Sequence, residues 1–308
     1  MDQVFPPTIV ILGPTASGKT RLACRLAATC AAGILSADSR QVYRGLTIGT
    51  GKDLHEFWVD GQAIPYYLID HVQPGESYDV AQFQQDALAV LTDFPHPVAI
   101  ICGGTGLYLQ AILQGFDRFQ YPVFPDLRER LESRSYEALL GEWEQLPSLA
   151  IAIDVSTKKR LIRGFEIRES LTNGFIPKTR PKLQPVVFGL NPSRDVRRER
   201  ISIRLKKRLQ EGLLEEVQGL LDQGVSEDWL DRLGLEYTWA MKRLRGQISD
   251  TEWVIGLETA IHQMAKRQMT FFRSMERKGI EIHWLDDNLE EEALLSEIKK
   301  KIPLHIIS

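Results

Sequence analysis

The sequence has few cysteines and no long hydrophobic run. Cys24, Cys30 and Cys102 are odd in number and lie in stretches with the pattern of buried helix or strand, so we predict neither a disulfide framework nor a zinc site. No apolar run approaches the ~20 residues that a membrane span needs, and Met1–Pro7 lacks the basic start and apolar stretch of a signal peptide. We therefore expect a cytoplasmic protein that does not bind a membrane.

The chain also lacks a strong overall charge. Its formal net charge is −3 over 308 residues, which argues against indiscriminate binding of nucleic acids. Positive charge is nevertheless concentrated locally, because eight basic residues and only two acidic ones lie between Arg194 and Arg208. Such a run is either the solvated face of a helix or a patch that binds a polyanion, and composition leaves both interpretations open.

What the chain does contain is a phosphate-binding motif. The residues Gly13–Thr20 follow the apolar run Thr8–Leu12 and precede a helical pattern over Arg21–Ala27, which is the strand, loop and helix order of a P-loop. In such a loop the backbone N–H groups and the helix N-terminus bind phosphate, the lysine adds a full charge, and the Thr20 hydroxyl can ligate Mg²⁺. We predict that the phosphate-binding residues are Gly13, Thr15, Ala16, Ser17, Gly18, Lys19 and Thr20.

The first third of the chain alternates between apolar, strand-like runs and helical periodicity. This alternation is typical of a parallel sheet covered by helices, so the predicted fold class is α/β, with a P-loop NTPase-like sheet flanked by helices. The predicted strands are Thr8–Leu12, Gly33–Ala37, Tyr66–Ile69 and Val98–Cys102, and the predicted helices are Lys19–Ala31 and Val80–Leu91.

The middle of the chain differs from the rest, which suggests three parts. Strand character fades between residues 119 and 184, where helix-prone stretches occur at Leu127–Leu146 and Thr157–Leu171. We predict the first part of the core at 1–118, a helical insertion at 119–184, and a return to the core with a basic helical C-terminal part at 185–308. The elements expected in the last part are a strand at Val186–Leu190, helices over Asp195–Arg273 and a strand at Ile280–Trp284.

Two further motifs are expected beside the P-loop, because ligands of parallel sheets bind beyond the carboxyl ends of the strands. The strand Val98–Cys102 continues into Gly103–Tyr108 without the carboxylate that ATP-hydrolysing P-loop proteins use. Its glycines either let a ligand approach the backbone or form a tight turn, and Thr105 offers a hydroxyl. After the second strand, Asp38 is a candidate Mg²⁺ ligand, general base or helix cap.

Seven motifs in one order carry a family resemblance. They are Gly13–Thr20, Ser36–Tyr43, Gly49–Lys52, Leu68–Asp70, Tyr78–Phe83, Gly103–Tyr108 and Ala265–Arg273. This ordered set resembles the tRNA dimethylallyltransferases, also called tRNA isopentenyltransferases. The resemblance spans nearly the whole chain.

The resemblance implies transfer of a dimethylallyl group from its diphosphate to the N6 atom of an adenosine beside the tRNA anticodon. The P-loop would then hold the leaving diphosphate with Mg²⁺ as the cofactor, and cations around it would stabilise the charge that develops as the C–O bond breaks. By similarity, Asp38 accepts the N6 proton, Thr105 supplies a hydroxyl in the channel, and Arg204 clamps the diphosphate.

The acceptor implied by the resemblance is a tRNA whose target adenine swings out of the anticodon loop into the enzyme. Basic residues would hold its backbone, the helical insertion would contact the anticodon stem, and we expect a monomer. The predicted residues for RNA or adenine binding are Ser39, Gln41, Lys266, Arg267, Gln268 and Arg273.

Departures from the family pattern keep alternatives open. Lys52-Asp53 stands where the family has Lys-Pro, and His262 stands where it has an arginine. An adenylate isopentenyltransferase acting on free AMP, ADP or ATP is the nearest alternative, although the long basic C-terminal half favours RNA. A small-molecule kinase that binds ATP at the same loop and an RNA-binding protein without catalysis are the others.

Overall fold

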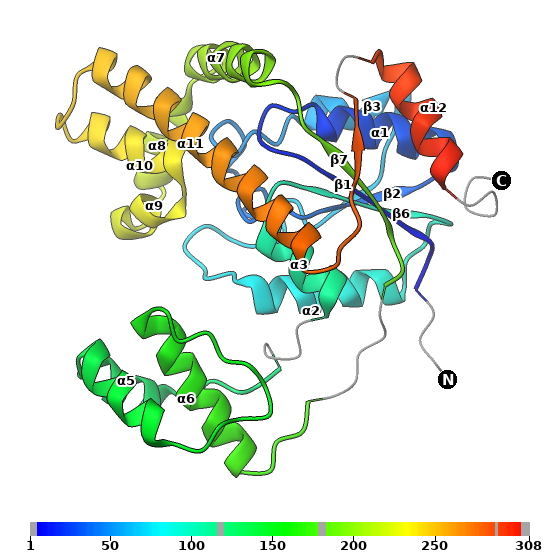
Figure 1. Ribbon diagram of the computed structural model, residues 1–308. Coiled ribbons are helices and arrows are strands. Elements are labelled where there is room, and N and C mark those ends of the chain that lie inside the picture. The colour runs from blue at the N-terminus through cyan, green and yellow to red at the C-terminus, as the bar shows by residue number, and fades with distance from the viewer. Residues whose placement is uncertain (1–4, 116–119, 178–182, 287–288, 303–308) are drawn as a thin grey trace. The chain divides into compact units, whose positions relative to one another are not determined.

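The computed structural model describes residues 5–115, 120–177, 183–286 and 289–302. The chain forms two compact units, of which the larger comprises residues 1–114 and 182–308 and the smaller residues 115–181. A six-stranded sheet in the order β5-β2-β6-β1-β7-β8 is the centre of the larger unit, and each of its strand pairs is parallel (Figure 1). This sheet confirms the predicted fold class.

The strands of the sheet lie close to their predicted positions, except for the two edge strands, β5 and β8. The strands are β1 (Thr8–Leu12), β2 (Gly33–Ser36), β5 (Tyr66–Tyr67), β6 (Ala99–Gly103), β7 (Val186–Leu190) and β8 (His283–Leu285). The strand predicted at Tyr66–Ile69 ends early because Leu68 has a φ of 60°, which is incompatible with extended backbone. The last strand lies three residues later than predicted at its start.

Alternate residues of β1 pack on opposite faces of the sheet. Ile9 and Ile11 belong to the apolar core beneath α1 (Lys19–Cys30) and α12 (Glu291–Lys301). Val10 and Leu12 belong to the core on the other face, which packs against α2 (Val80–Thr92), α3 (Gly106–Gln114) and the second half of α11 (Asp250–Arg277). A parallel sheet covered on both faces explains the continuous apolar runs in the sequence.

Side-chain caps fix where two of these helices begin. Asp79 accepts hydrogen bonds from the backbone N–H groups of Ala81 and Gln82, and the Gln82 side chain accepts one from Asp79 N, which together start α2. Ser249 and Glu252 form the same reciprocal arrangement at the start of α11. Capping boxes of this kind satisfy N–H groups that a helix leaves without an intrahelical partner.

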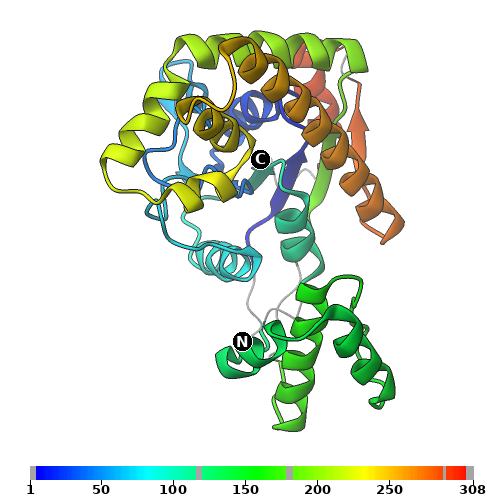
Figure 2. The same ribbon diagram turned by 90° about the vertical axis from the view of Figure 1, so that its left-hand side faces the viewer.

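A second group of helices packs on its own apolar core within the larger unit. It contains α7 (Arg194–Gln210), α8 (Leu213–Asp222), α9 (Glu227–Leu233), α10 (Leu235–Leu244) and the first half of α11. Val42, Tyr43 and Leu46, from the segment after β2, belong to the same core. In Figure 2, where this group faces the viewer, the strands lie behind it. The helical character predicted for 195–273 is confirmed.

The sequence analysis missed a small hairpin that follows this segment. A 3-10 turn, η1 (Leu54–Phe57), leads into β3 (Trp58–Val59), which pairs antiparallel with β4 (Gln62–Ala63). Asp60 and Gly61 form the turn with φ values of 48° and 83°. Asp-Gly is a strong hairpin signal, but strands of two residues are too short to show a hydrophobic period.

In its described residues, 120–177, the smaller unit contains three helices, α4 (Pro125–Glu132), α5 (Tyr136–Gln145) and α6 (Lys158–Thr172). The helical stretch predicted at Leu127–Leu146 is therefore two helices, because Ser135 caps the second one through Ala138 N. Leu131, Leu139, Leu161, Ile162 and Phe165 form the apolar core. The buried Glu166 carboxylate pairs with Arg128 at 2.7 Å and with Arg163 at 3.1 Å, so its charge is compensated.

The structure also bears on what the sequence analysis excluded. The three cysteines are free, and burial raises the pKa of the Cys102 thiol to about 12. Among the described residues, no helix has the length and apolar character that a membrane crossing requires. The same residues contain no group of three or more histidine, cysteine or acidic side chains placed to hold a metal ion.

The glycines after β6 make room for protein atoms. A Cβ atom at Gly103 would lie 2.2 Å from the carbonyl oxygen of Ala37, and one at Gly106 would lie 2.3 Å from the Phe271 ring. Of the two interpretations of this motif, close packing within the protein accounts for both positions. The end of β6 is thereby held against the backbone that leads into Asp38.

We predict that Gly103→Ala lowers the free energy of unfolding by about 1–3 kcal/mol or more, because backbone atoms of Ala37 would have to move. Urea unfolding measures this change. Gly219→Ala is the matched control, since nothing lies within 4 Å of its Cβ position on α8, and it should be neutral or stabilising by up to about 1 kcal/mol. Equal stability of the two variants would contradict this packing argument.

Candidate active site

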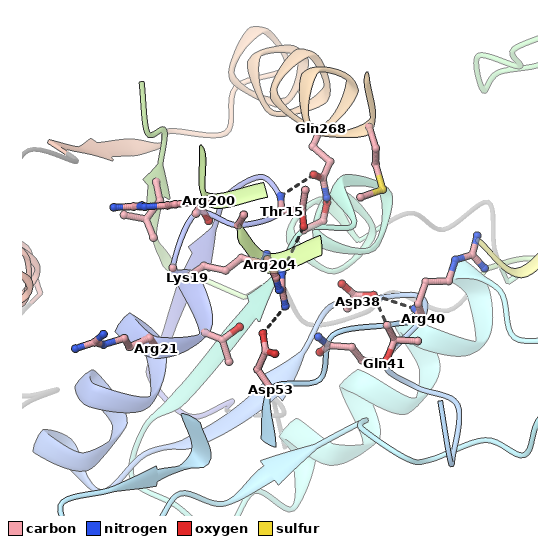
Figure 3. Close-up of a pocket in the computed structure, with 18 of the residues that line it drawn as sticks. Thr15, Lys19, Arg21, Asp38, Arg40, Gln41, Asp53, Arg200, Arg204 and Gln268 are labelled. Atoms are coloured by element: carbon pink, nitrogen blue, oxygen red, sulfur yellow. Dashed lines mark hydrogen bonds and ion pairs between the residues drawn. The ribbon is translucent and has the colours of Figure 1, made fainter. Parts of the chain in front are cut away.

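A cavity of about 840 Å³ opens among the loops that follow β1, β2 and β6 and the helices α7 and α11. The P-loop residues Thr15–Thr20 line it, as do residues from the segments 38–41, 49–56 and 104–106. Arg204 on α7 and Gln268 on α11 reach into the same cavity (Figure 3). Segments far apart in sequence thus meet at one place.

The P-loop has the geometry of an anion-binding nest. Ala16 and Gly18 have φ values of 59° and 84°, and left-handed residues placed in this way turn the N–H groups of a loop toward one side. The hydroxyl oxygen of Ser17 is buried without a hydrogen-bond partner in the described part of the chain. Gly13 does not line the cavity, because it lies beneath the loop, where a Cβ atom would be 2.6 Å from Ser17 Oγ.

Lys19 supplies the positive charge of this loop. Its Nζ atom lies 3.4 Å from the carbonyl oxygen of Pro14. Burial lowers the pKa of Lys19, and the nearby Arg204 lowers it further. Cys102 and Asp38 raise the pKa of the same lysine. An anion bound in the loop would favour the charged form of the lysine, so the site is suited to phosphate.

Asp38 and Thr105 are brought together by the pairing of β2 with β6. Ser39 N donates to Thr105 Oγ1 at 3.1 Å, and Thr105 Oγ1 lies 3.4 Å from Ser39 Oγ. The Asp38 Oδ1 atom accepts from the backbone N–H of Arg40 at 2.9 Å and of Gln41 at 3.4 Å, which fixes the carboxylate at the cavity wall (Figure 3). Asp38 lies after a strand and caps no described helix of the chain.

The two predicted glutamines hold protein groups in this structure. Gln268 Oε1 accepts from Thr15 N at 2.9 Å, and its Nε2 donates to Gly104 O at 3.0 Å, so it ties the P-loop to the loop after β6. Gln41 Nε2 donates to Gly51 O at 3.0 Å, and its Oε1 accepts from Ser36 Oγ at 3.1 Å. Sequence reasoning assigned both amides to RNA or adenine; the geometry shows them engaged with the protein.

Arg204 lies between the P-loop and the segment around residue 51. Its guanidinium donates to Gly51 O at 3.1 Å and to Thr15 Oγ1 at 3.5 Å, and it forms an ion pair with Asp53 (Figure 3). Arg208, one turn further along α7, is buried and pairs with Glu236 at 3.0 Å. Arg208 is therefore not part of an exposed patch, although the sequence analysis grouped it with the basic run.

The remaining basic residues of the run Arg194–Arg208, and the basic residues predicted to bind RNA on α11, are exposed or partly exposed. Arg267 lines the cavity, whereas Lys266 and Arg273 are exposed on α11 outside it. Burial lowers the pKa of Arg197, and the positive charges of Arg194 and Arg273 lower it further. No ion pair involves them among the residues that the structure describes.

Sequence reasoning did not assign a role to several residues of the cavity. Asp53, Glu56 and Arg40 line it, and burial raises the pKa of Glu56, with the neighbouring Asp53 as a further cause. Asp53 was noted only as a departure from the family pattern. The signal for the other two is their place in the sequence, because Arg40 lies within the motif Ser36–Tyr43 and Glu56 follows the motif Gly49–Lys52 by four residues.

Comparisons with known proteins show the family of this chain. The family described as IPP transferase matches residues 41–275, and the family described as isopentenyl transferase matches residues 7–71. A tRNA dimethylallyltransferase 2 of Bacteroides fragilis is 44% identical over 297 residues, which are 96% of this chain and 97% of that protein. A tRNA dimethylallyltransferase 1 of Porphyromonas gingivalis is 46% identical over 283 residues, which are 90% and 93% of the two chains.

Solved structures show the same fold. A full-length tRNA isopentenylpyrophosphate transferase from Bacillus halodurans is 31% identical with a TM-score of 0.71, covering 97% of this chain and 96% of that one. A eukaryotic dimethylallyltransferase acting on tRNA shares the fold, with 21% sequence identity and a TM-score of 0.75. The superposition covers 97% of this chain and 80% of that one. The family resemblance drawn from the seven motifs is confirmed: the chain belongs to the IPP transferase family.

Proposed function

We propose that this protein transfers a dimethylallyl group from dimethylallyl diphosphate to the N6 atom of an adenosine beside the anticodon of a tRNA. The observation that supports it most is a single cavity in which a phosphate loop with Lys19 and Arg204 meets the pair Asp38 and Thr105. The relatives named tRNA dimethylallyltransferase support the same reaction.

On the donor side, the reaction needs positive charge around the leaving group. The allylic C–O bond breaks, an N–C bond to the adenine forms, and diphosphate departs with the negative charge. The P-loop N–H groups, Lys19 and the Arg204 guanidinium would stabilise that charge, and a guanidinium can do so through two parallel hydrogen bonds.

On the acceptor side, the reaction needs a base for the proton that N6 loses. Asp38 is the carboxylate of the cavity that is held by backbone N–H groups next to the Thr105 hydroxyl. A carboxylate fixed in this way can accept a proton from an amine within hydrogen-bond reach. The adenine would enter the cavity unstacked, as bases do in enzymes that modify them.

The cavity suits Mg²⁺ held jointly with diphosphate. Thr20 lines it at the first turn of α1, and Asp38, Asp53 and Glu56 line it with carboxylates, while a cage of three such ligands is absent among the described residues. Mg²⁺ in phosphate sites takes one or two protein ligands together with substrate oxygens. When bound, the ion would neutralise negative charge on the leaving diphosphate.

The RNA would lie over the cationic surface of α7 and α11. We propose that this surface comprises Arg194, Arg197, Arg198, Arg200, Lys266, Arg267 and Arg273, none of which has an ion-pair partner in the described part of the chain. We propose further that the smaller unit contacts the anticodon stem, and that the enzyme acts as a monomer in the cytoplasm, where tRNA is found. One chain supplies both halves of the cavity.

The direct test uses labelled dimethylallyl diphosphate, Mg²⁺ and no ATP, with either an unmodified anticodon stem-loop or AMP as the acceptor. We expect the label to enter the RNA alone. Label entering only AMP would favour the adenylate isopentenyltransferase. No transfer of label to either acceptor, together with phosphoryl transfer once ATP is added, would favour the kinase.

We predict that Asp38→Ala lowers kcat by about 10²–10⁴-fold, because removing a positioned general base has that effect, while the Kd for the stem-loop changes little. Single-turnover transfer and filter binding measure the two quantities. Asp38→Asn retains the size of the side chain but cannot take the proton, so it should lose activity to the same degree. Full turnover in D38N would remove Asp38 from the reaction.

We predict that Arg273→Gln weakens stem-loop binding and reduces the slope of log Kd against log salt concentration by about 1, as expected for one lost phosphate contact. Its affinity for pyrophosphate should not change, because Arg273 lies outside the cavity. Lys300→Gln, which removes one exposed charge from α12, is the matched control. The same salt dependence in both variants would place the RNA elsewhere.

A further inference from the structure

The Glu216 side chain on α8 makes an unusually large set of hydrogen bonds. Its carboxylate accepts from three consecutive backbone N–H groups, those of Thr47 at 2.8 Å, Ile48 at 2.6 Å and Gly49 at 3.0 Å. It also accepts from the hydroxyl of the buried Tyr237 at 2.8 Å. Four hydrogen bonds match the acceptor capacity of a carboxylate, and charge makes each of them stronger than a neutral one.

The segment that Glu216 holds, residues 47–53, is closed on itself by backbone hydrogen bonds. Gly51 N donates to Ile48 O at 3.1 Å, and Lys52 N donates to Thr47 O at 3.2 Å. Within the segment, the fully buried Lys52 ammonium donates to Tyr43 O at 2.6 Å and to Asp70 at 2.5 Å. The segment is therefore anchored by two separate sets of contacts, those of Glu216 and those of Lys52.

This segment touches both halves of the cavity through one carbonyl group. Gly51 O accepts from Gln41 Nε2 at 3.0 Å and from Arg204 Nη2 at 3.1 Å. Gln41 follows Asp38 on the acceptor side, and Arg204 belongs to the diphosphate side. Gly51 has a φ of 59°, and a Cβ atom there would lie 1.7 Å from Arg208 Nη2, so the backbone fits tightly under both arginines.

The same segment holds Arg204 through a charge as well. Asp53, at its end, forms an ion pair with the Arg204 guanidinium, whose other nitrogen points at Thr15 of the P-loop. The position of Arg204 over the P-loop thus depends on the position of residues 51 and 53. Those residues belong to the segment whose first three N–H groups are fixed by Glu216.

We propose that Glu216 is a positioning residue of this site: by fixing residues 47–49 it sets the Gly51 carbonyl and Asp53, and through them the Arg204 guanidinium that meets diphosphate. This inference rests on the proposed function, since it assigns Arg204 to the leaving group. Glu216 itself does not line the cavity, so it acts on diphosphate only through Arg204.

The test is a double-mutant cycle read by calorimetric titration with inorganic pyrophosphate and Mg²⁺. We expect Glu216→Gln to weaken pyrophosphate binding by about tenfold, within the range that coupled neighbours show. The same substitution in an Arg204→Ala background should have no further effect, because the residue through which it acts is gone. Glu215→Gln, the neighbouring exposed glutamate on α8, should bind as the wild type does.

A general loss of structure would weaken binding equally with and without Arg204, so an additive effect of E216Q would overturn the proposal. Wild-type affinity in E216Q would also overturn it. A wild-type protein that binds no pyrophosphate would instead refute the proposed function, and this inference with it. If E216Q does not fold, Tyr237→Phe replaces it, since it removes one hydrogen bond to Glu216, and a weaker effect with the same dependence on Arg204 is expected.

Discussion

Repulsion between cations is the constraint on which this site depends. Lys19, Arg204 and Arg208 line one cavity, and besides burial the nearness of Arg204 lowers the pKa of both Lys19 and Arg208. Asp53 and Glu236 offset the repulsion by pairing with the two arginines. The cations are thus arranged before a substrate arrives, which is the condition for stabilising charge in a transition state without reorganisation.

The topology of the sheet determines where these groups meet. Because β2, β6 and β1 are adjacent and parallel, their carboxyl ends place Asp38, Thr105 and the P-loop side by side. The helical group then adds Arg204 from α7 and Gln268 from α11. In the proposed reaction the strand ends would supply the base and the phosphate loop, and the helices would supply further cations and supports.

Much of this arrangement could be predicted from the sequence because its signals are local. The P-loop, the apolar strands β1, β6 and β7, and the ordered family motifs each occupy one short stretch of the chain. The short β3–β4 hairpin was missed because its strands have no detectable period. The contacts of Gln268 with Thr15 and Gly104, and those of Glu216 with residues 47–49, join residues more than 160 positions apart, and no local pattern reveals such pairs.

The central claim is that the loop Gly13–Thr20 receives the diphosphate of a prenyl donor beneath Arg204. A crystal structure with an unreactive thiolodiphosphate analogue of dimethylallyl diphosphate tests it most directly. The account predicts both phosphorus atoms within hydrogen-bond reach of the loop's N–H groups, with Arg204 bound to phosphate oxygens and the allylic carbon facing Asp38. An analogue bound elsewhere, with the loop empty under saturating conditions, would contradict it.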